Sequence, residues 1–297
     1  MDYESKIALA EKIRNRPFRF EVPSEQKELV NTVAIEKKRI ETRHGLTDFW
    51  LIQADEKKDI LVLNIHGGGF CKPHNEGDLA FCASIAKHTK ATILDIDYKL
   101  APEHPFPVAY QECYDLILWA IKNQKGLGIT AERIVIIGHS SGGNIGTAVV
   151  FDALKHQDFV VAELILDYPP LDLYTDPEKK EGAALSHVPV EVARAYNSLY
   201  TEDDKSNPYV SPVFAGNEMM SNFPDTTLLL AGKDVLKFEG MNFARKLIEN
   251  GVLVTVKLFE DAHHGFTITY EGDEWRKSQK IIIEKVLGNA VVGFDHL

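Results

Sequence analysis

The chain has 297 residues, of which 44% are hydrophobic and 26% charged, a balance typical of a globular protein with a sizeable core. Its formal net charge of −11 at pH 7 argues against nucleic acid and anionic membranes as partners. The three cysteines have no spacing typical of a metal site or a disulfide framework. The sequence shows no secretory signal pattern and no apolar stretch long enough to span a bilayer, so we expect no stable membrane insertion and a cytoplasmic location.

Strand-like and helix-like segments alternate through most of the chain after a polar, helix-like stretch of about forty residues. Apolar runs predict strands at residues 47–54, 60–65, 91–98, 133–137, 161–168, 226–230 and 253–259. Helical patterns fall at residues 76–89, 108–123, 141–155 and 239–250, with a last helix from residue 274. This alternation predicts an α/β fold with a doubly wound, mostly parallel sheet. It stops between residues 169 and 223, which therefore form an insertion.

The pentapeptide Gly138-His139-Ser140-Ser141-Gly142 lies between a predicted buried strand and a predicted helix. A serine in a Gly-x-Ser-x-Gly turn at this position is typical of a nucleophile elbow. Glycines are required there because the turn is too tight for side chains, and the strained backbone holds the serine hydroxyl clear of the sheet. The pattern predicts Ser140 as a nucleophile.

A serine nucleophile needs a base and an acid that orients the base, and both are expected in loops at the carboxyl ends of strands. Asp234 follows the predicted strand 226–230, and two adjacent histidines, His263 and His264, follow the strand 253–259. The order Ser140, Asp234, His264 is that of α/β hydrolases. The spacing alone does not separate the two histidines, although the next residue, a glycine, favours close approach of His264.

Three other carboxylates lie near these loops. We expect Asp261 to lie outside the reach of the elbow, because it is only three residues from His264. Asp167 and Asp172 flank the strand after Ser140, and we expect structural roles for both.

The glycine-rich segment Ile65-His66-Gly67-Gly68-Gly69-Phe70 also follows a predicted strand. Consecutive residues without side chains can aim backbone N–H groups at a developing oxyanion. The alternatives are a flexible turn or a phosphate-binding loop, but the latter would end in Gly-Lys-Ser/Thr. We therefore predict an oxyanion hole formed by the N–H groups of Gly67, Gly68 and Ser141, the last at the start of a helix.

These motifs resemble the hormone-sensitive-lipase-like branch of the α/β hydrolases. The resemblance rests on five segments in the order of that family: His66-Gly67-Gly68-Gly69, Tyr98-Lys99-Leu100-Ala101-Pro102-Glu103, Gly138-His139-Ser140-Ser141-Gly142-Gly143-Asn144, Gly232-Lys233-Asp234-Val235-Leu236 and His264-Gly265-Phe266. The chain departs from it at His139, where many relatives carry aspartate, and at Ser141, where alanine is common.

The resemblance implies a serine esterase without metal or cofactor, acting on small-molecule esters with short or medium acyl chains. It assigns Ser140 as nucleophile, His264 as general base and Asp234 as orienting acid. It also implies a helical cap made of residues 1–34 and 169–223 over a catalytic core made of residues 35–168 and 224–297. Deacetylation of sugars or other small acetyl esters, and a catalytically silent small-molecule receptor on the same fold, are the alternatives.

The cap is expected to set specificity. Aromatic residues in its two segments are candidates to line the pocket or to form the cap's own core: Phe18, Phe20, Tyr196, Tyr200 and Phe214. An edge strand at the end of the sheet can pair two copies of the chain, so a homodimer is one expected assembly.

Overall fold

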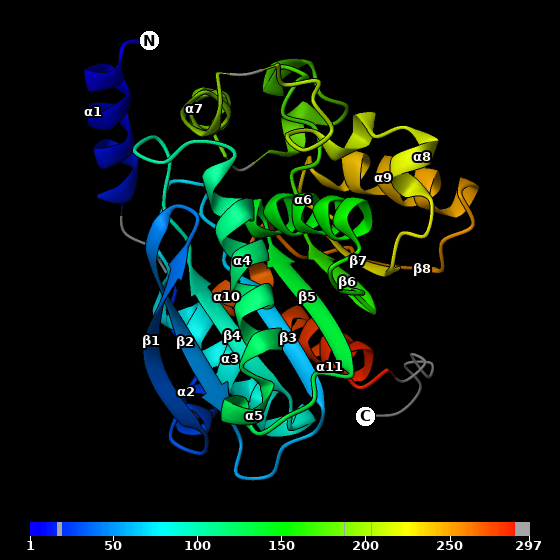
Figure 1. The fold of residues 1–297 in the computed structure, drawn as a ribbon. Helices are drawn as coiled ribbons and strands as arrows, with labels where there is room; N and C mark the ends of the chain where they lie inside the picture. The colour runs from blue at the N-terminus through cyan, green and yellow to red at the C-terminus, as the bar shows by residue number, and fades with distance from the viewer. Residues whose placement is uncertain (17–19, 187, 203, 289–297) are drawn as a thin grey trace.

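The computed structural model describes residues 1–16, 20–186, 188–202 and 204–288, and within them one sheet of eight strands lies at the centre (Figure 1). The spatial order is β1-β2-β4-β3-β5-β6-β7-β8. Strands β1 and β2 pair antiparallel, β2 pairs antiparallel with β4, and all other neighbours are parallel. The strands are β1 (Ala34–Thr42), β2 (Gly45–Gln53), β3 (Ile60–Ile65), β4 (Thr92–Asp97), β5 (Arg133–His139), β6 (Glu163–Asp167), β7 (Asp225–Ala231) and β8 (Val254–Phe259).

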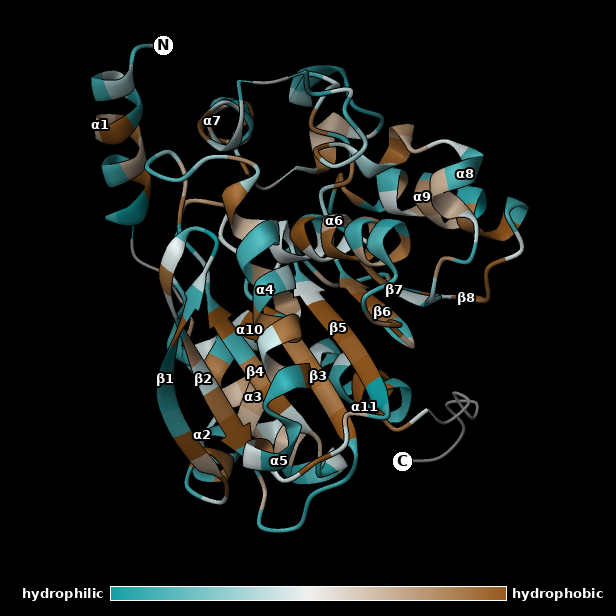
Figure 2. Ribbon diagram, viewed as in Figure 1, coloured by the Kyte–Doolittle hydropathy of each residue, from teal (hydrophilic) through white to brown (hydrophobic). Residues whose placement is uncertain are grey.

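Helices cover both faces of this sheet. One layer contains α4 (Val108–Lys122), α5 (Gln124–Leu127), α6 (Ser141–His156) and α9 (Lys237–Glu249), and the other contains α2 (Ser24–Val30), α3 (Glu76–Thr89), α10 (Phe266–Thr269) and α11 (Glu274–Val286). Side chains of a strand point alternately to the two layers, so Leu61 and Leu63 lie in one core cluster and Val62 in the other. The apolar central strands in Figure 2 match burial on both faces.

The predicted α/β-hydrolase architecture is confirmed, with strand and helix ends that agree with the sequence pattern to within a few residues. The helix expected at residues 76–89 is present as α3 with the same ends. Its start is fixed locally, because Asn75 and Asp78 form a reciprocal capping box at its amino end. The sequence indicated β structure from residue 35, and the structure resolves it as β1, which pairs with β2 as a hairpin.

Residues 169–223 contain no strand in their described part. They form α7 (Val190–Tyr200), α8 (Asn217–Met220) and three short 3-10 turns (Pro177–Lys179, Ala183–Leu185 and Pro212–Phe214). Helix α1 (Tyr3–Arg14) packs beside α7, away from α2, which packs on α3 (Figure 1). The division into a core and a cap of residues 1–34 and 169–223 remains a proposal; within residues 1–34, α1 contacts the insertion through α7, and α2 contacts α3 of the core. None of the helices in the described residues is both long and apolar enough to cross a bilayer.

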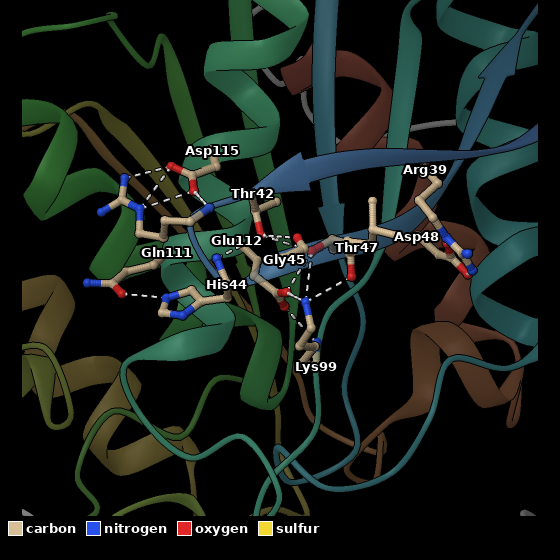
Figure 3. A network of polar contacts seen from close by, with 12 residues as sticks. Arg39, Thr42, His44, Gly45, Thr47, Asp48, Lys99, Gln111, Glu112 and Asp115 are labelled. Atoms are coloured by element: carbon tan, nitrogen blue, oxygen red, sulfur yellow. Dashed lines mark hydrogen bonds and ion pairs between the residues drawn. The ribbon is translucent and has the colours of Figure 1, made fainter.

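A polar network anchors the β1–β2 hairpin to α4 and to the segment after β4 (Figure 3). The fully buried carboxylate of Glu112 accepts hydrogen bonds from the hydroxyl of Thr47 at 2.6 Å and from the backbone N–H of Lys99 at 2.8 Å. The ammonium of Lys99 also contacts Glu112 and donates to the carbonyl of Leu46 at 3.0 Å. This buried carboxylate therefore fixes the start of the segment that runs from Tyr98 to Glu103.

Candidate active site

Ser140 lies in a sharp turn between β5 and α6. Its backbone has φ = 50° and ψ = −121°, outside the regions that residues with side chains favour, and its N–H donates to the carbonyl of Asp167 at 2.8 Å. A Cβ atom at Gly138 would lie 2.4 Å from the carbonyl oxygen of Gly142, and one at Gly142 would lie 2.0 Å from that of Ile65. The two glycines of the pentapeptide are thus required by the closeness of the backbone.

The structure brings together the three polar residues selected from the sequence. The hydroxyl of Ser140 lies 2.9 Å from Nε2 of His264, and Nδ1 of the same ring lies 2.7 Å from Oδ2 of Asp234. The other carboxylate oxygen of Asp234 accepts from the N–H of Leu236 at 3.2 Å. The loops that carry Asp234 and His264 follow the adjacent strands β7 and β8, and the N–H of Lys233 joins them by donating to the carbonyl of Ala262 at 3.0 Å.

Two opposing effects act on the imidazole of His264. Burial by itself lowers its pKa, but the charge of Asp234 and the hydrogen bond to that carboxylate outweigh burial, so the pKa of His264 lies above that of an ordinary histidine. With Nδ1–H donated to Asp234, Nε2 is the acceptor nitrogen that faces Ser140. This arrangement can take the hydroxyl proton and hold the resulting imidazolium.

The structure separates the alternatives that the sequence left open. His264, and not His263, contacts both Ser140 and Asp234. Asp261 has an 86% exposed side chain and pairs with Lys233 at 3.3 Å, so it points away from the elbow. The carboxylate of Asp167 lies 2.8 Å from the ring of His139, and that of Asp172 accepts the backbone N–H groups of Tyr174 and Thr175.

The glycine loop after β3 lies directly beside the elbow. A Cβ atom at Gly67 would lie 3.2 Å from Cβ of Ser140. Gly68 and Gly69 have φ of 120° and 60°, values that glycine adopts without strain. No hydrogen bond within the described residues is donated by the N–H groups of Gly67, Gly68 or Ser141. The N–H group of Gly69 also donates no hydrogen bond within the described residues. Gly69 is part of the same glycine run but is not among the predicted oxyanion donors.

A cavity of about 350 Å³ opens onto Ser140, His264 and the glycine loop. Its core side includes Leu236 and Ile268, and its cap side includes Val188, Val190, Ala193 and Tyr196. The lining is mostly apolar, and the volume is at the small end of the range for ligand pockets. The site is therefore built to bury an apolar group next to a hydroxyl, an imidazole and free backbone donors.

The five aromatic candidates for the cap have different positions. Tyr196 packs on the glycine loop and lines the cavity, since a Cβ atom at Gly69 would lie 2.3 Å from its ring. Tyr200 is buried and stacks on Phe70 at 3.7 Å between ring centroids. Among the described residues, Tyr200, Phe20 and Phe214 do not line the cavity; Phe214 is 42% exposed and Phe20 packs at the start of α3. Phe18 lies outside the described residues.

Sequence reasoning missed a buried polar chain beneath the elbow. It crosses four neighbouring strands through His74–Asp95 at 2.6 Å, Asp95–Asn64 at 2.9 Å, Asn64–His139 at 3.2 Å and His139–Asp167 at 2.8 Å. Burial lowers the pKa of His74, but the charge of Asp95 and its hydrogen bond raise it to about 9. The available signals were Asn64 in the otherwise apolar strand β3 and Asp95 between a leucine and an isoleucine in β4.

The fold and the site can be compared with those of known proteins. A family model for the alpha/beta hydrolase fold matches residues 62–268 of the chain. The chain belongs to this α/β-hydrolase family. The resemblance to the hormone-sensitive-lipase-like branch is also confirmed, because the chain is 41% identical to bovine (Bos taurus) hormone-sensitive lipase over 109 residues. That match covers 37% of this chain and 14% of the lipase.

Other similar proteins match over more of the chain. It is 31% identical to an arylesterase from Saccharolobus solfataricus over 198 residues, which is 65% of this chain and 63% of the arylesterase. The match thus spans less than two thirds of that relative. A solved structure of an esterase from Pyrobaculum calidifontis superposes with a TM-score of 0.82 and 25% identity, covering 97% of this chain and 94% of that one.

Proposed function

We propose that this α/β hydrolase is a serine carboxylesterase that cleaves small esters with short- to medium-chain acyl groups. The observation that carries the proposal is the hydrogen-bonded chain Ser140–His264–Asp234 at the end of a small apolar cavity beside a loop of free N–H groups. Names of similar proteins, among them an arylesterase and an esterase, agree with this activity. The apolar lining and the limited volume of the cavity favour a short acyl chain.

In the proposed reaction, Oγ of Ser140 bonds to the ester carbonyl carbon while its proton moves to Nε2 of His264. The carbonyl oxygen becomes an oxyanion and accepts hydrogen bonds from the N–H groups of Gly67, Gly68 and Ser141. His264 then gives its proton to the leaving alkoxide, the carbon–oxygen bond to the alcohol breaks, and an acyl group remains on Ser140. Water repeats the sequence and releases the acid, while Asp234 stays ionised and holds Nδ1–H.

The decisive test is the variant Ser140→Ala with p-nitrophenyl butyrate as substrate and a fluorophosphonate as covalent probe. We expect turnover to fall on the order of 10⁵-fold or more, and labelling to disappear, without loss of the folded state by circular dichroism. Ser141→Ala is the matched control, because it removes the adjacent hydroxyl and leaves the backbone donor in place. Retained turnover in Ser140→Ala would reject the role of the nucleophile.

A wider substrate panel tests the acyl specificity. We expect the highest kcat/KM for p-nitrophenyl esters of two to eight acyl carbons. Faster cleavage of acetylated sugars would instead favour the deacetylase, and tight reversible binding of an ester without labelling of Ser140 would favour a receptor. Each of these results would contradict the proposed carboxylesterase. The panel is needed because one fold can carry several functions.

The predicted homodimer and the cytoplasmic location stay predictions. Strand β8 pairs only with β7 in the sheet of the described residues, and its side chains Val256 and Leu258 are 37% and 39% exposed. An exposed edge strand of this kind can pair with the edge strand of a second copy of the chain.

A further inference from the structure

The glycine loop has three consecutive residues without side chains, so contacts from other segments matter for its conformation. Gly68 and Gly69 have positive φ, and glycine loses more conformational entropy on folding than any other residue, so ordering this loop is costly. Two hydrogen bonds from the segment after β4 reach carbonyls of the loop. The side-chain hydroxyl of Tyr98 donates to the carbonyl of His66 at 3.2 Å, and the backbone N–H of Ala101 donates to the carbonyl of Phe70 at 3.0 Å. The loop and the segment 98–103 therefore form one unit.

The guanidinium of Arg14, at the end of α1, binds both parts of this unit. Its Nε donates to the carbonyl of Cys71 at 2.8 Å, directly after the glycine loop, and its Nη2 donates to the carbonyl of Ala101 at 2.9 Å. Its Nη1 and Nη2 each donate at 2.6 Å to the carboxylate of Glu103, a planar bidentate pair. One side chain from the first helix thus joins three points around the loop.

The packing of α1 explains how Arg14 is presented there. Ala10 and Ile13 are buried in a small apolar cluster with Ala195 and Leu199 of α7 and with Cys71 of the loop. Helix α1 lies beside α7 at the edge of the molecule, away from the sheet (Figure 1). The side chain of Arg14 is 22% exposed and that of Glu103 is 35% exposed, so their ion pair is only partly screened by solvent.

We propose that Arg14 is a positioning residue for the oxyanion donors, a role that rests on the esterase function proposed above. It acts through the carbonyls of Cys71 and Ala101 and touches neither the substrate nor Ser140. By fixing the backbone directly after Gly67, Gly68 and Gly69, it holds their N–H groups at the place where negative charge develops. Helix α1, remote in sequence from all other site residues, thereby becomes part of the esterase machinery.

The test compares Arg14→Met, which keeps an apolar stem of similar length, with Arg14→Lys, which keeps the charge but not the planar fork. Arg194→Met is the matched control, because Arg194 is also a cap arginine in a bidentate ion pair, with Asp176, and does not contact the glycine loop. We expect Arg14→Met to lower kcat for p-nitrophenyl butyrate by about 10- to 100-fold with little change in KM, in proportion to the weakened oxyanion donors. The kcat of Arg14→Lys should lie between those of the wild type and Arg14→Met. The kcat of Arg194→Met should stay within about twofold of the wild type.

Two further readouts distinguish positioning from a loss of fold. The inhibition constant of a butyryl trifluoromethyl ketone, whose adduct with the serine carries an oxyanion, should rise in Arg14→Met in parallel with the fall in kcat/KM. Added methylguanidinium should restore part of the activity of Arg14→Met, and methylammonium should restore less. Unchanged kcat, or a lower kcat with an unchanged inhibition constant, would overturn the proposal.

Hydrogen exchange of the peptide that covers residues 67–72 separates this inference from the proposed function, because it needs no turnover. We expect faster exchange in Arg14→Met than in the wild type and Arg194→Met. Equal exchange rates in the wild type and both variants would reject the role of Arg14. If the wild type hydrolyses no ester but exchange is still faster in Arg14→Met, only the proposed esterase function would be rejected. If Arg14→Met does not fold, Glu103→Gln, which leaves both carbonyl contacts in place, should show a smaller change in the same direction.

Discussion

The carboxyl ends of the parallel strands and the helices above them shape the same cavity by different means. Ser140, Asp234 and His264 each stand a few residues beyond a buried strand, so the sheet itself fixes where they meet. Tyr196 and Arg14 come from α7 and α1, which have no place in the sheet and reach the glycine loop only by side-chain contacts. In the proposed enzyme, the strand ends supply the chemistry, whereas α7 lines the pocket and α1 contributes to the proposed positioning of the glycine loop.

The largest effect is expected at a strand end. Asp234→Asn keeps the volume of the side chain but favours the wrong tautomer of His264, so kcat should fall by about 10⁴-fold. Asp261→Asn is the matched control from the neighbouring loop, because that carboxylate points to solvent, and it should leave kcat unchanged. Steady-state kinetics with p-nitrophenyl butyrate measures both, and similar losses in the two variants would contradict the assignment of Asp234.

A second prediction concerns pH. As the proposed base, His264 accepts the proton only as the neutral imidazole, and its pKa is raised by Asp234, so activity should be lost as the pH falls through a value above 6.5. Below that midpoint kcat/KM should decrease about tenfold per pH unit, as for a single ionisation. A profile of kcat/KM between pH 5 and 9 locates the midpoint, and a midpoint below 6.5 would show that Asp234 does not raise the pKa of the base.

The smallest effect is expected in the cap. Tyr196→Ala removes a ring that lines the cavity, so the ratio of kcat/KM for octanoyl over butyryl esters should rise by about tenfold, while kcat for the short ester changes less. Phe214→Ala truncates a second aromatic of the same insertion, one that is exposed and contacts only the ring of Tyr174 among the aromatic residues described. The octanoyl-to-butyryl ratio of kcat/KM in Phe214→Ala should stay within about twofold of the wild-type ratio. An equal rise of this ratio in both variants would contradict the specific role of Tyr196 in the pocket.

The sequence determined the sheet, the elbow and the loops that carry Asp234 and His264, because strand patterns and tight glycine turns are set by neighbouring residues. The glycine run likewise indicated backbone donors near Ser140 without any tertiary information. These features were predictable since each depends on short-range geometry, and the position of a loop at a strand end follows from the direction of the strand.

Only the tertiary structure decided which of two adjacent histidines faces Ser140, which cap ring covers Gly69, and that Arg14 holds the loop more than fifty residues further along the chain. It also joined His74, Asp95, Asn64, His139 and Asp167 into one buried chain. Contacts of this kind link residues that are distant in sequence and share no periodic pattern. They are selected by packing and by the need of buried polar groups for partners, which become defined only when the whole chain is folded.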